Sequence, residues 1–181
     1  VRSESLADML GSLTQYAAHQ LGGITRKVTL FAVPEIHLAD LRIVTDLDDT
    51  YKDADLKVYV SVANSSGSVR KDVSVRLSIS GLPVVLNQNI PEIAAGSVWN
   101  GWLTGKVASP RKWDNEHPDL YTLKVEVGTS DKVVEQVEKR FGFREVQIQG
   151  NRLLVNGKAV KLRGVCRHEM HPLTGRVMNP E

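Results

Sequence analysis

The chain has 181 residues, enough for one ordinary domain with attachments but short of the roughly 250 that a (β/α)₈ barrel needs. Hydrophobic residues make up 41% and charged residues 24%, a composition typical of folded globular proteins. The net charge of +2, without basic clusters interleaved with aromatics, argues against a nucleic-acid partner. No apolar run reaches the roughly 18 residues of a membrane helix, so no membrane partner is expected.

The first 34 residues combine a weak helical pattern with one short strand pattern. Leu6, Met9, Leu10 and Leu13 fall at helical spacing and predict a short, marginal helix. Val28 and Leu30 alternate with Thr29, which predicts a strand that ends before Pro34. The start at Val1 lacks the features of a signal peptide. Because the chain begins at Val1 without a Met and ends within a motif, we interpret it as excised from a longer protein. Its compartment, cytoplasmic or periplasmic, stays open.

From Pro34 the sequence indicates β structure throughout. Several runs alternate apolar and polar residues, and turn residues such as Asn64-Ser-Ser-Gly67 separate them. The residues around Ile36–Ile43 change parity, which predicts a bulge near Ala39-Asp40. Short alternating strands without intervening helices predict an all-β fold, an immunoglobulin-like antiparallel β-sandwich of roughly 100 residues. The clearest strand patterns are Leu56-Val58-Val60-Val62, Val73-Val75-Leu77-Ile79 and Tyr121-Leu123-Val125-Val127.

A hairpin pattern follows Arg144. Asn156-Gly157 is the strongest short hairpin signal in the chain, because both residues tolerate positive φ. We expect 146–148 and 152–155 to be its leading strands and 159–163 to be the returning arm. An isolated hairpin is marginal in water, so the tail needs a surface, either the edge of its own sandwich or a second copy of the chain. The second copy is the favoured alternative, which would make a homo-oligomer.

The only dense cluster of reactive side chains lies near the C-terminal end. Arg167, His168, Glu169 and His171 form it, but the spacing is not the His-Glu-x-x-His that places two imidazoles on one helical turn. No metal site is therefore predicted, and a polar loop is the simpler interpretation. The single cysteine, Cys166, excludes an internal disulfide.

Four segments together resemble family 2 glycoside hydrolases, and in particular their β-galactosidase branch. They span about residues 21–181 and comprise Leu21-Gly-Gly-Ile-Thr-Arg26, Phe141-Gly-Phe-Arg144, Leu153-Leu-Val-Asn-Gly-Lys158 and Arg167-His-Glu169. The resemblance implies a lead-in and jelly-roll remnant over 1–33, the immunoglobulin-like sandwich over 34–143, and a hairpin with the first strand of the catalytic (β/α)₈ barrel over 144–181. These flanking segments would belong to neighbouring domains.

The resemblance also implies a division of labour. The parent would hydrolyse terminal β-D-galactosides with retention, which requires two carboxylates about 5 Å apart. In this family both are glutamates of later barrel strands, so no catalytic residue is expected here and the fragment itself should be inactive. Arg167, His168 and Glu169 would help to shape the sugar pocket. The parent would need its remaining domains and could use Mg²⁺ or Na⁺, while the fragment would carry no cofactor.

Other interpretations stay open at this point. The parent could be a β-glucuronidase or β-mannosidase of the same family, or the sandwich could be a non-catalytic module for adhesion or glycan binding. Trp113 is expected to be a buried strut at the end of the sandwich, and the Tyr121 hydroxyl to anchor a corner. An exposed ring among Trp99, Trp102 and Trp113 could instead stack on sugar.

Overall fold

The computed structural model describes residues 27–130 and 132–166, which form strands and no helix. Within these ranges nothing offers a helix of the length and apolarity that a membrane crossing requires. The described residues form ten strands: β1 (Ile36–Leu47), β2 (Ala54–Asn64), β3 (Arg70–Ile79), β4 (Val85–Ile93), β5 (Val98–Val107), β6 (Tyr121–Thr129), β7 (Lys132–Phe141), β8 (Val146–Gln149), β9 (Arg152–Val155) and β10 (Lys158–Ala159).

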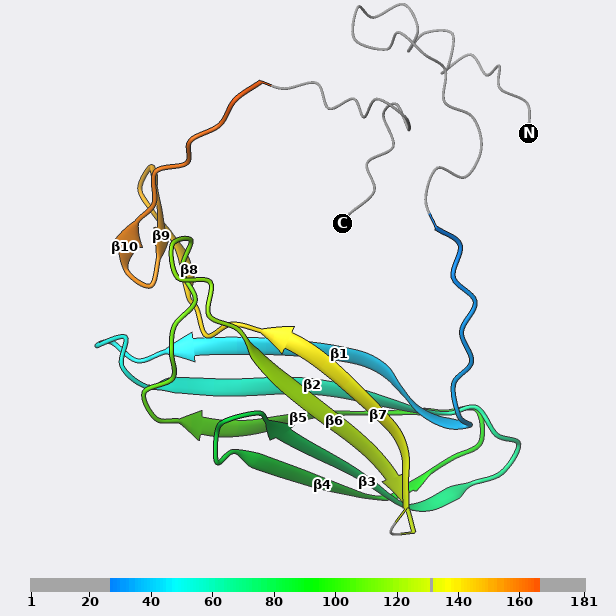
Figure 1. Ribbon diagram of the computed structural model, residues 1–181. Helices are drawn as coiled ribbons and strands as arrows, with labels where there is room; N and C mark the ends of the chain where they lie inside the picture. The colour runs from blue at the N-terminus through cyan, green and yellow to red at the C-terminus, as the bar shows by residue number, and fades with distance from the viewer. Residues whose placement is uncertain (1–26, 131, 167–181) are drawn as a thin grey trace, which may run out of the picture. The chain divides into compact units, whose positions relative to one another are not determined.

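The first seven strands form two antiparallel sheets, in the orders β1-β2-β5 and β4-β3-β6-β7. Figure 1 shows the strands of both sheets, with β1 and β2 in one layer and β6 and β7 in the other. This is the expected all-β, immunoglobulin-like sandwich, so the predicted fold class is confirmed. The strand β4 pairs with β3 as an edge strand, a position that tolerates Pro91 because an edge leaves one side of the ladder unpaired.

The core consists of the apolar faces of the two sheets. Val58, Val60 and Val62 of β2 are fully buried, as are Leu123 and Val125 of β6. The residues between them, such as Lys57 and Tyr59, occupy the opposite face, as period-2 alternation requires. Burying one such side chain contributes about 1.5–3 kcal/mol, so this row of branched side chains is the main source of the fold's stability.

The predicted bulge in β1 is confirmed. The register with β2 shifts between Leu38 and Asp40, which leaves Ala39 without a partner in the ladder. The Glu135 carboxylate of β7 accepts a hydrogen bond from the freed Leu38 N–H at 2.6 Å. The bulge therefore gives β1 a polar contact with β7, a strand of the opposite sheet.

Asn64 connects the end of β2 to the end of β4. Only 1% of its surface is exposed, and its amide nitrogen donates to the carbonyl oxygens of Ser68, Ile93 and Ala94 at 2.8–3.1 Å. Its amide oxygen accepts from the backbone N–H and the hydroxyl of Ser66. Because every polar atom of this buried side chain is paired, Asn64 can link the two sheets without a desolvation penalty.

The strand predicted around Val28 and Leu30 is wrong. Residues 27–34 form no strand, and the side chains of Val28 and Leu30 are 78% and 98% exposed. A strand needs a neighbour for its backbone groups, and none of the described strands pairs with this segment. The predicted helix and the whole Leu21–Arg26 motif lie outside the described residues.

Candidate functional site at the junction of sandwich and hairpin

Two of the motifs that carry the family resemblance, Phe141–Arg144 and Leu153–Lys158, meet where β7 ends and the hairpin begins. The chain leaves β7 at Phe141, and Gly142 to Glu145 lead to β8. Phe143 is completely buried, with ring centroids 5.2 Å from Phe141 and 5.3 Å from Tyr121, both in edge-to-face geometry. This aromatic cluster fixes the exit of the chain from the sandwich core.

Tyr121 anchors the loop that precedes β6. Its hydroxyl accepts a hydrogen bond from the Arg111 backbone N–H at 2.8 Å. The Arg111 guanidinium lies over the Tyr121 ring, 5.7 Å from its centroid, and pairs with Asp119 at 3.1 Å. The predicted role of the Tyr121 hydroxyl as a corner anchor is therefore confirmed.

Trp113 differs from its prediction, because its side chain is only half-buried. The Arg144 guanidinium covers it, 4.5 Å from the ring centroid, in a cation–π contact. Gly142 lies under it, and a Cβ at position 142 would approach the Trp113 Cβ to 2.6 Å. The absence of a side chain at Gly142 thus lets Trp113 pack closely against residues 142–145, the exit segment between β7 and β8.

The Trp113 backbone forms hydrogen bonds both to the exit segment and to the hairpin. Its N–H donates to the Phe143 carbonyl at 2.9 Å, and its carbonyl accepts from the Asn156 side-chain amide at 3.0 Å. The Thr45 hydroxyl of β1 donates to the Arg144 carbonyl at 2.9 Å and accepts from the Arg144 N–H at 3.3 Å. Strand β1, the Trp113 loop and the exit segment are therefore held together by specific hydrogen bonds.

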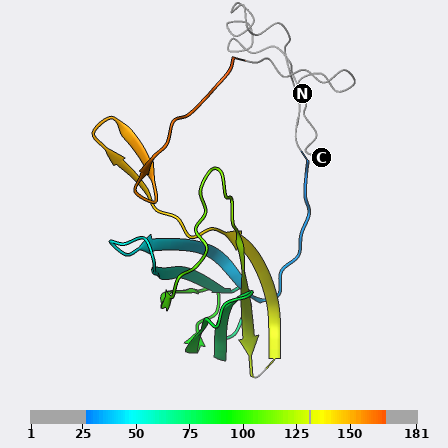
Figure 2. The ribbon, with the colours of Figure 1, turned by 60° about the vertical axis from the view of Figure 1, so that its left-hand side comes forward.

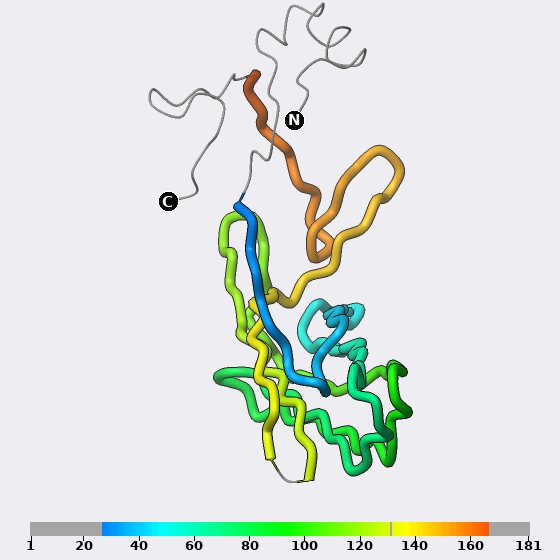
Figure 3. The backbone as a smooth tube through the Cα atoms, turned by 90° about the vertical axis from the view of Figure 1, so that its right-hand side faces the viewer, coloured from blue at the N-terminus to red at the C-terminus, as the bar shows by residue number. Residues whose placement is uncertain are grey.

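Asn156 is the hairpin residue that contacts this network. It has a φ of 49° and Gly157 a φ of 73°, so the predicted Asn-Gly turn is confirmed. The Asn156 side-chain oxygen accepts from the Glu145 N–H at 2.9 Å, and the Asn156 N–H donates to the Glu145 carbonyl at 2.9 Å. With its bond to Trp113, Asn156 links the hairpin turn to the exit segment and to the sandwich loop. Figures 2 and 3 let the reader follow the backbone from β7 into this hairpin.

A second contact joins the turn to the loop between β1 and β2. The Tyr51 ring lies on Gly157, where a Cβ would meet the ring at 2.7 Å. The loop is organised by the Asp48 carboxylate, which accepts hydrogen bonds from the backbone N–H groups of Thr50, Lys52 and Asp53. The Lys52 N–H bond is the largest cause that lowers the pKa of Asp48 below its ordinary value of 3.8. The charged carboxylate therefore holds Tyr51 under the turn.

The returning arm is shorter than predicted. Strand β10 covers only Lys158–Ala159, and Val160 adds one more bond, from its N–H to the Leu153 carbonyl at 2.9 Å. Leu162 and Val165 are 79% and 89% exposed, whereas Leu154 and Val155 are buried within the chain. The contacts of Asn156 and Gly157 show that the hairpin leans on its own sandwich, the alternative that was not favoured. The homo-oligomer stays a prediction.

The residues predicted to shape the sugar pocket, Arg167, His168 and Glu169, lie outside the described residues. Three glutamates of the described strands and of the segment after β7 already have structural partners. Glu126 pairs with Lys124 at 2.6 Å, Glu135 accepts from Leu38, and Glu145 accepts from the Gln147 amide. Over the described ranges no group of three or more histidine, cysteine or acidic residues is placed to hold a metal ion.

The sequence did not predict the role of Asn64 or the bridging role of Asn156, because both depend on residues distant in the chain.

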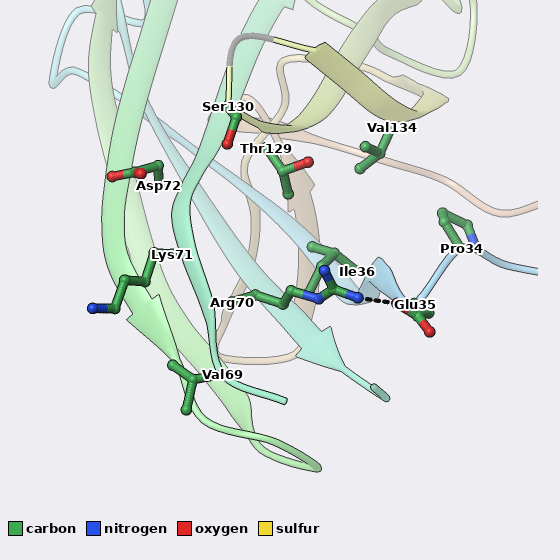
Figure 4. Close-up of a pocket in the computed structure, with 10 residues that line it drawn as sticks. All are labelled: Pro34, Glu35, Ile36, Val69, Arg70, Lys71, Asp72, Thr129, Ser130 and Val134. Carbon is green, nitrogen blue, oxygen red and sulfur yellow. Dashed lines mark hydrogen bonds and ion pairs between the residues drawn. The ribbon is translucent and has the colours of Figure 1, made fainter. Parts of the chain in front are cut away.

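A pocket of about 610 Å³ lies where β1 and β3 begin and β6 ends. Figure 4 shows its lining, with Glu35 paired to Arg70 and Asp72 on the other side of Arg70. The remaining side chains that line it are mainly aliphatic or hydroxylated, among them Ile36, Thr129 and Val134. Because Arg70 neutralises Glu35, the pocket offers no pair of free carboxylates for glycoside hydrolysis.

The fold is an immunoglobulin-like sandwich followed by a hairpin that packs against its end. Residues 36–144 match the profile of Glycosyl hydrolases family 2, and residues 146–181 match the TIM barrel domain of the same family. The chain therefore belongs to glycosyl hydrolases family 2 and contains its immunoglobulin-like domain and the start of its barrel.

Individual relatives carry different activities in their names. A β-galactosidase of Vibrio vulnificus is 36% identical over 89% of this chain and 16% of its own length. A Formosa agariphila protein, provisionally named a β-glucuronidase, is 35% identical over 87% of this chain and 19% of its own length. The crystal structure of Bacteroides uniformis β-glucuronidase has a TM-score of 0.69 at 24% identity, covering 81% of this chain and 19% of that one. That similarity shows the fold alone. The chain spans less than a fifth of the length of these relatives.

Proposed function

We propose that this chain is the part of a retaining β-galactosidase in which the sandwich holds the start of the catalytic barrel in a fixed position. The observation that carries the proposal is the set of hydrogen bonds from Asn156 to Glu145 and Trp113. These bonds, with the Tyr51–Gly157 contact, attach the hairpin to two loops of the sandwich. A barrel that grows from an anchored hairpin inherits a defined orientation relative to the sandwich.

The choice of β-galactosides rests on two supports. β-Galactosidases of Vibrio vulnificus and Aeromonas hydrophila are 36% and 34% identical to the chain. The Arg167-His168-Glu169 segment also resembles the β-galactosidase branch. A second candidate, β-glucuronide hydrolysis, is favoured by the Formosa agariphila relative at 35% identity. A uronide differs from a galactoside by a carboxylate, so the pocket of the whole protein must distinguish a charged substrate from a neutral one.

In this proposal the chain positions the start of the barrel and contributes to the wall of the sugar pocket, and the rest of the barrel contributes the catalytic residues. A retaining mechanism needs one carboxylic acid as acid/base and one carboxylate as nucleophile, about 5 Å apart. Later strands of the parent's barrel would contribute both. Arg167, His168 and Glu169 would border the sugar, because the carboxyl ends of barrel strands face the active site. A Mg²⁺ or Na⁺ ion would belong to the parent, whose other domains are the partners of this chain.

The test uses the full-length protein that contains this chain. Its hydrolysis of p-nitrophenyl β-D-galactoside and β-D-glucuronide is compared through kcat/KM at one pH. We expect the galactoside to be the better substrate and the product to keep the β configuration. A higher kcat/KM for the glucuronide would overturn the galactosidase assignment in favour of the second candidate. Inverted product configuration would overturn the retaining mechanism.

A further inference from the structure

The outer face of the sheet β1-β2-β5 carries an aromatic row that the fold does not need. Arg42, Tyr59 and Trp102 are direct cross-strand neighbours, since Arg42 pairs with Tyr59 and Tyr59 with Trp102. Trp102 is 53% exposed, although the opposite face of the same sheet supplies the core. Tryptophan and tyrosine rings are enriched at binding surfaces, because they combine a large apolar face with a polar group.

The geometry of the row sets one ring apart as a platform. The Tyr59 and Trp102 centroids lie 5.3 Å apart with an angle of 59° between the planes, so a flat ligand can lie parallel to only one ring at a time. Both the ring face and the hydroxyl of Tyr59 already have partners within the chain. Its ring faces the Arg42 guanidinium at 5.0 Å, and its hydroxyl donates to the Asn100 side-chain oxygen at 2.9 Å. The Trp102 indole is therefore the ring that can accept a ligand.

Polar groups next to the indole are of the kind that bind hydroxyls. Asn100 and Thr104 flank Trp102 on the same face of β5, and both are exposed. The Asn100 amide oxygen is oriented by Tyr59, which leaves the amide N–H groups of Asn100 to donate to a ligand. An aromatic face beside amide and hydroxyl groups matches a pyranose, which has an apolar C–H face and a rim of hydroxyls.

The charges of this face point to a neutral ligand. The exposed charged side chains on it are three acidic and three basic, and they include the ion pairs Arg42–Asp40 at 3.3 Å and Lys57–Asp46 at 3.8 Å. Balanced and paired charges give no net field to attract a polyanion or a charged protein surface. The six residues are Asp40, Asp46, Asp55, Arg42, Lys57 and Lys106.

We propose that Trp102, with Asn100 and Thr104, forms a surface subsite that stacks one pyranose ring of a neutral β-linked oligosaccharide. Where both linkages of a ring are equatorial, as in β-1,4-linked glucose, they leave its C–H faces free to lie on the indole. The subsite does not depend on the substrate of the parent's catalytic barrel. Its affinity is expected to be millimolar, because one stacking ring and two polar side chains contribute little free energy against the cost of association.

The experiment titrates the ¹⁵N-labelled chain with cellotetraose and follows the indole N–H signals together with the backbone amides of β2 and β5. We expect a saturable shift of the Trp102 indole N–H and of its neighbours. Trp102→Ala should weaken binding at least about tenfold, the consequence of losing an aromatic stack of roughly 1.4 kcal/mol. Trp113→Phe, a change at a half-buried ring outside this sheet, is the matched control and should bind as the unsubstituted chain does.

Three results would overturn the proposal. The first is the absence of a saturable shift at Trp102, and the second is equal binding by Trp102→Ala. The third is a chain that self-associates through this face, so that Trp102→Ala lowers the sedimentation coefficient while cellotetraose leaves the indole signal unchanged. Unchanged amide shifts in strands β3 and β6 of Trp102→Ala establish that the variant is folded.

Discussion

Replacing Asn156 separates the contributions of one side chain to the junction. Asn156→Ala removes the acceptor for the Glu145 N–H and the donor to the Trp113 carbonyl. It also places alanine at a φ of 49°, a region that non-glycine residues other than asparagine and aspartate rarely adopt. Asn156→Gly removes the same side-chain hydrogen bonds, but glycine adopts this positive φ without strain. Asn156→Asp keeps an acceptor for Glu145 and loses the donor to Trp113.

The magnitude follows from these losses. Two hydrogen bonds of a half-buried side chain contribute about 0.5–1.5 kcal/mol each, and alanine at positive φ costs about 1 kcal/mol more. The docked hairpin should therefore lose about 2–4 kcal/mol in Asn156→Ala, and about 1 kcal/mol less in Asn156→Gly. The loss concerns local opening of the hairpin, because the sandwich core contains none of these atoms.

Amide hydrogen exchange measures this local opening. The Glu145 and Val160 N–H groups bond across the junction and within the hairpin, and their protection should fall about 30- to 1000-fold in Asn156→Ala. The protection of Val125 in the core should stay unchanged. Asn151→Ala, in the exposed turn between β8 and β9, is the matched control. Equal protection of Glu145 in Asn156→Ala and Asn151→Ala would refute the reasoning.

Three further predictions concern the sandwich and its loops. Asn64→Asp should lower the free energy of unfolding by about 3 kcal/mol in a denaturant titration at neutral pH, because a carboxylate would face the three carbonyls that now accept from the amide. Asn87→Asp, on the exposed face of β4, is the control. A loss for Asn64→Asp no larger than that of the control would contradict the role of Asn64. Gly142→Ala should lower the free energy of unfolding by about 1–3 kcal/mol, since the added Cβ would lie 2.6 Å from the Trp113 Cβ. Gly67→Ala is the control, because a Cβ there meets nothing within 4 Å. Equal melting temperatures for the two variants would disprove the close packing. The pKa of Asp48 is lowered in the folded chain, so its charge stabilises the Tyr51 loop at pH values above the unfolded pKa of about 3.8, and this stabilisation is lost as pH falls through the folded pKa. The Tyr51–Gly157 contact, measured by ring-current shifts of Gly157, should therefore weaken between about pH 6 and pH 2. Asp48→Asn should flatten this pH dependence, while Asp49→Asn should leave it as it is.

The sequence predicted the elements whose signal is local. Alternation identified β2, β3 and β6, because each has one face in the core, and the change of parity located the bulge at Ala39. The Asn156-Gly157 turn followed from the backbone preferences of its two residues. These features depend on neighbours in the sequence, so a pattern of a few residues suffices to predict them.

Features that depend on distant partners were predicted less well or missed. A strand around Val28 has the right alternation but no pairing partner among the described strands, and alternation alone cannot supply one. Trp113 was expected to be buried, yet the Arg144 guanidinium covers it from a position 31 residues later, a contact that has no sequence signal. The five hydrogen bonds of the Asn64 side chain are equally invisible, because asparagine before Ser-Ser-Gly67 reads as an ordinary turn residue.

The hairpin is attached to the sandwich as part of one compact unit. Backbone ¹⁵N relaxation of the chain tests this most directly, by comparing the rotational correlation time of Val155 in β9 with that of Val125 in β6. The hydrogen bonds of Asn156 and the Tyr51–Gly157 contact predict the same correlation time for both residues. A clearly shorter correlation time for Val155, in a chain whose β6 amides keep their chemical shifts, would contradict the account.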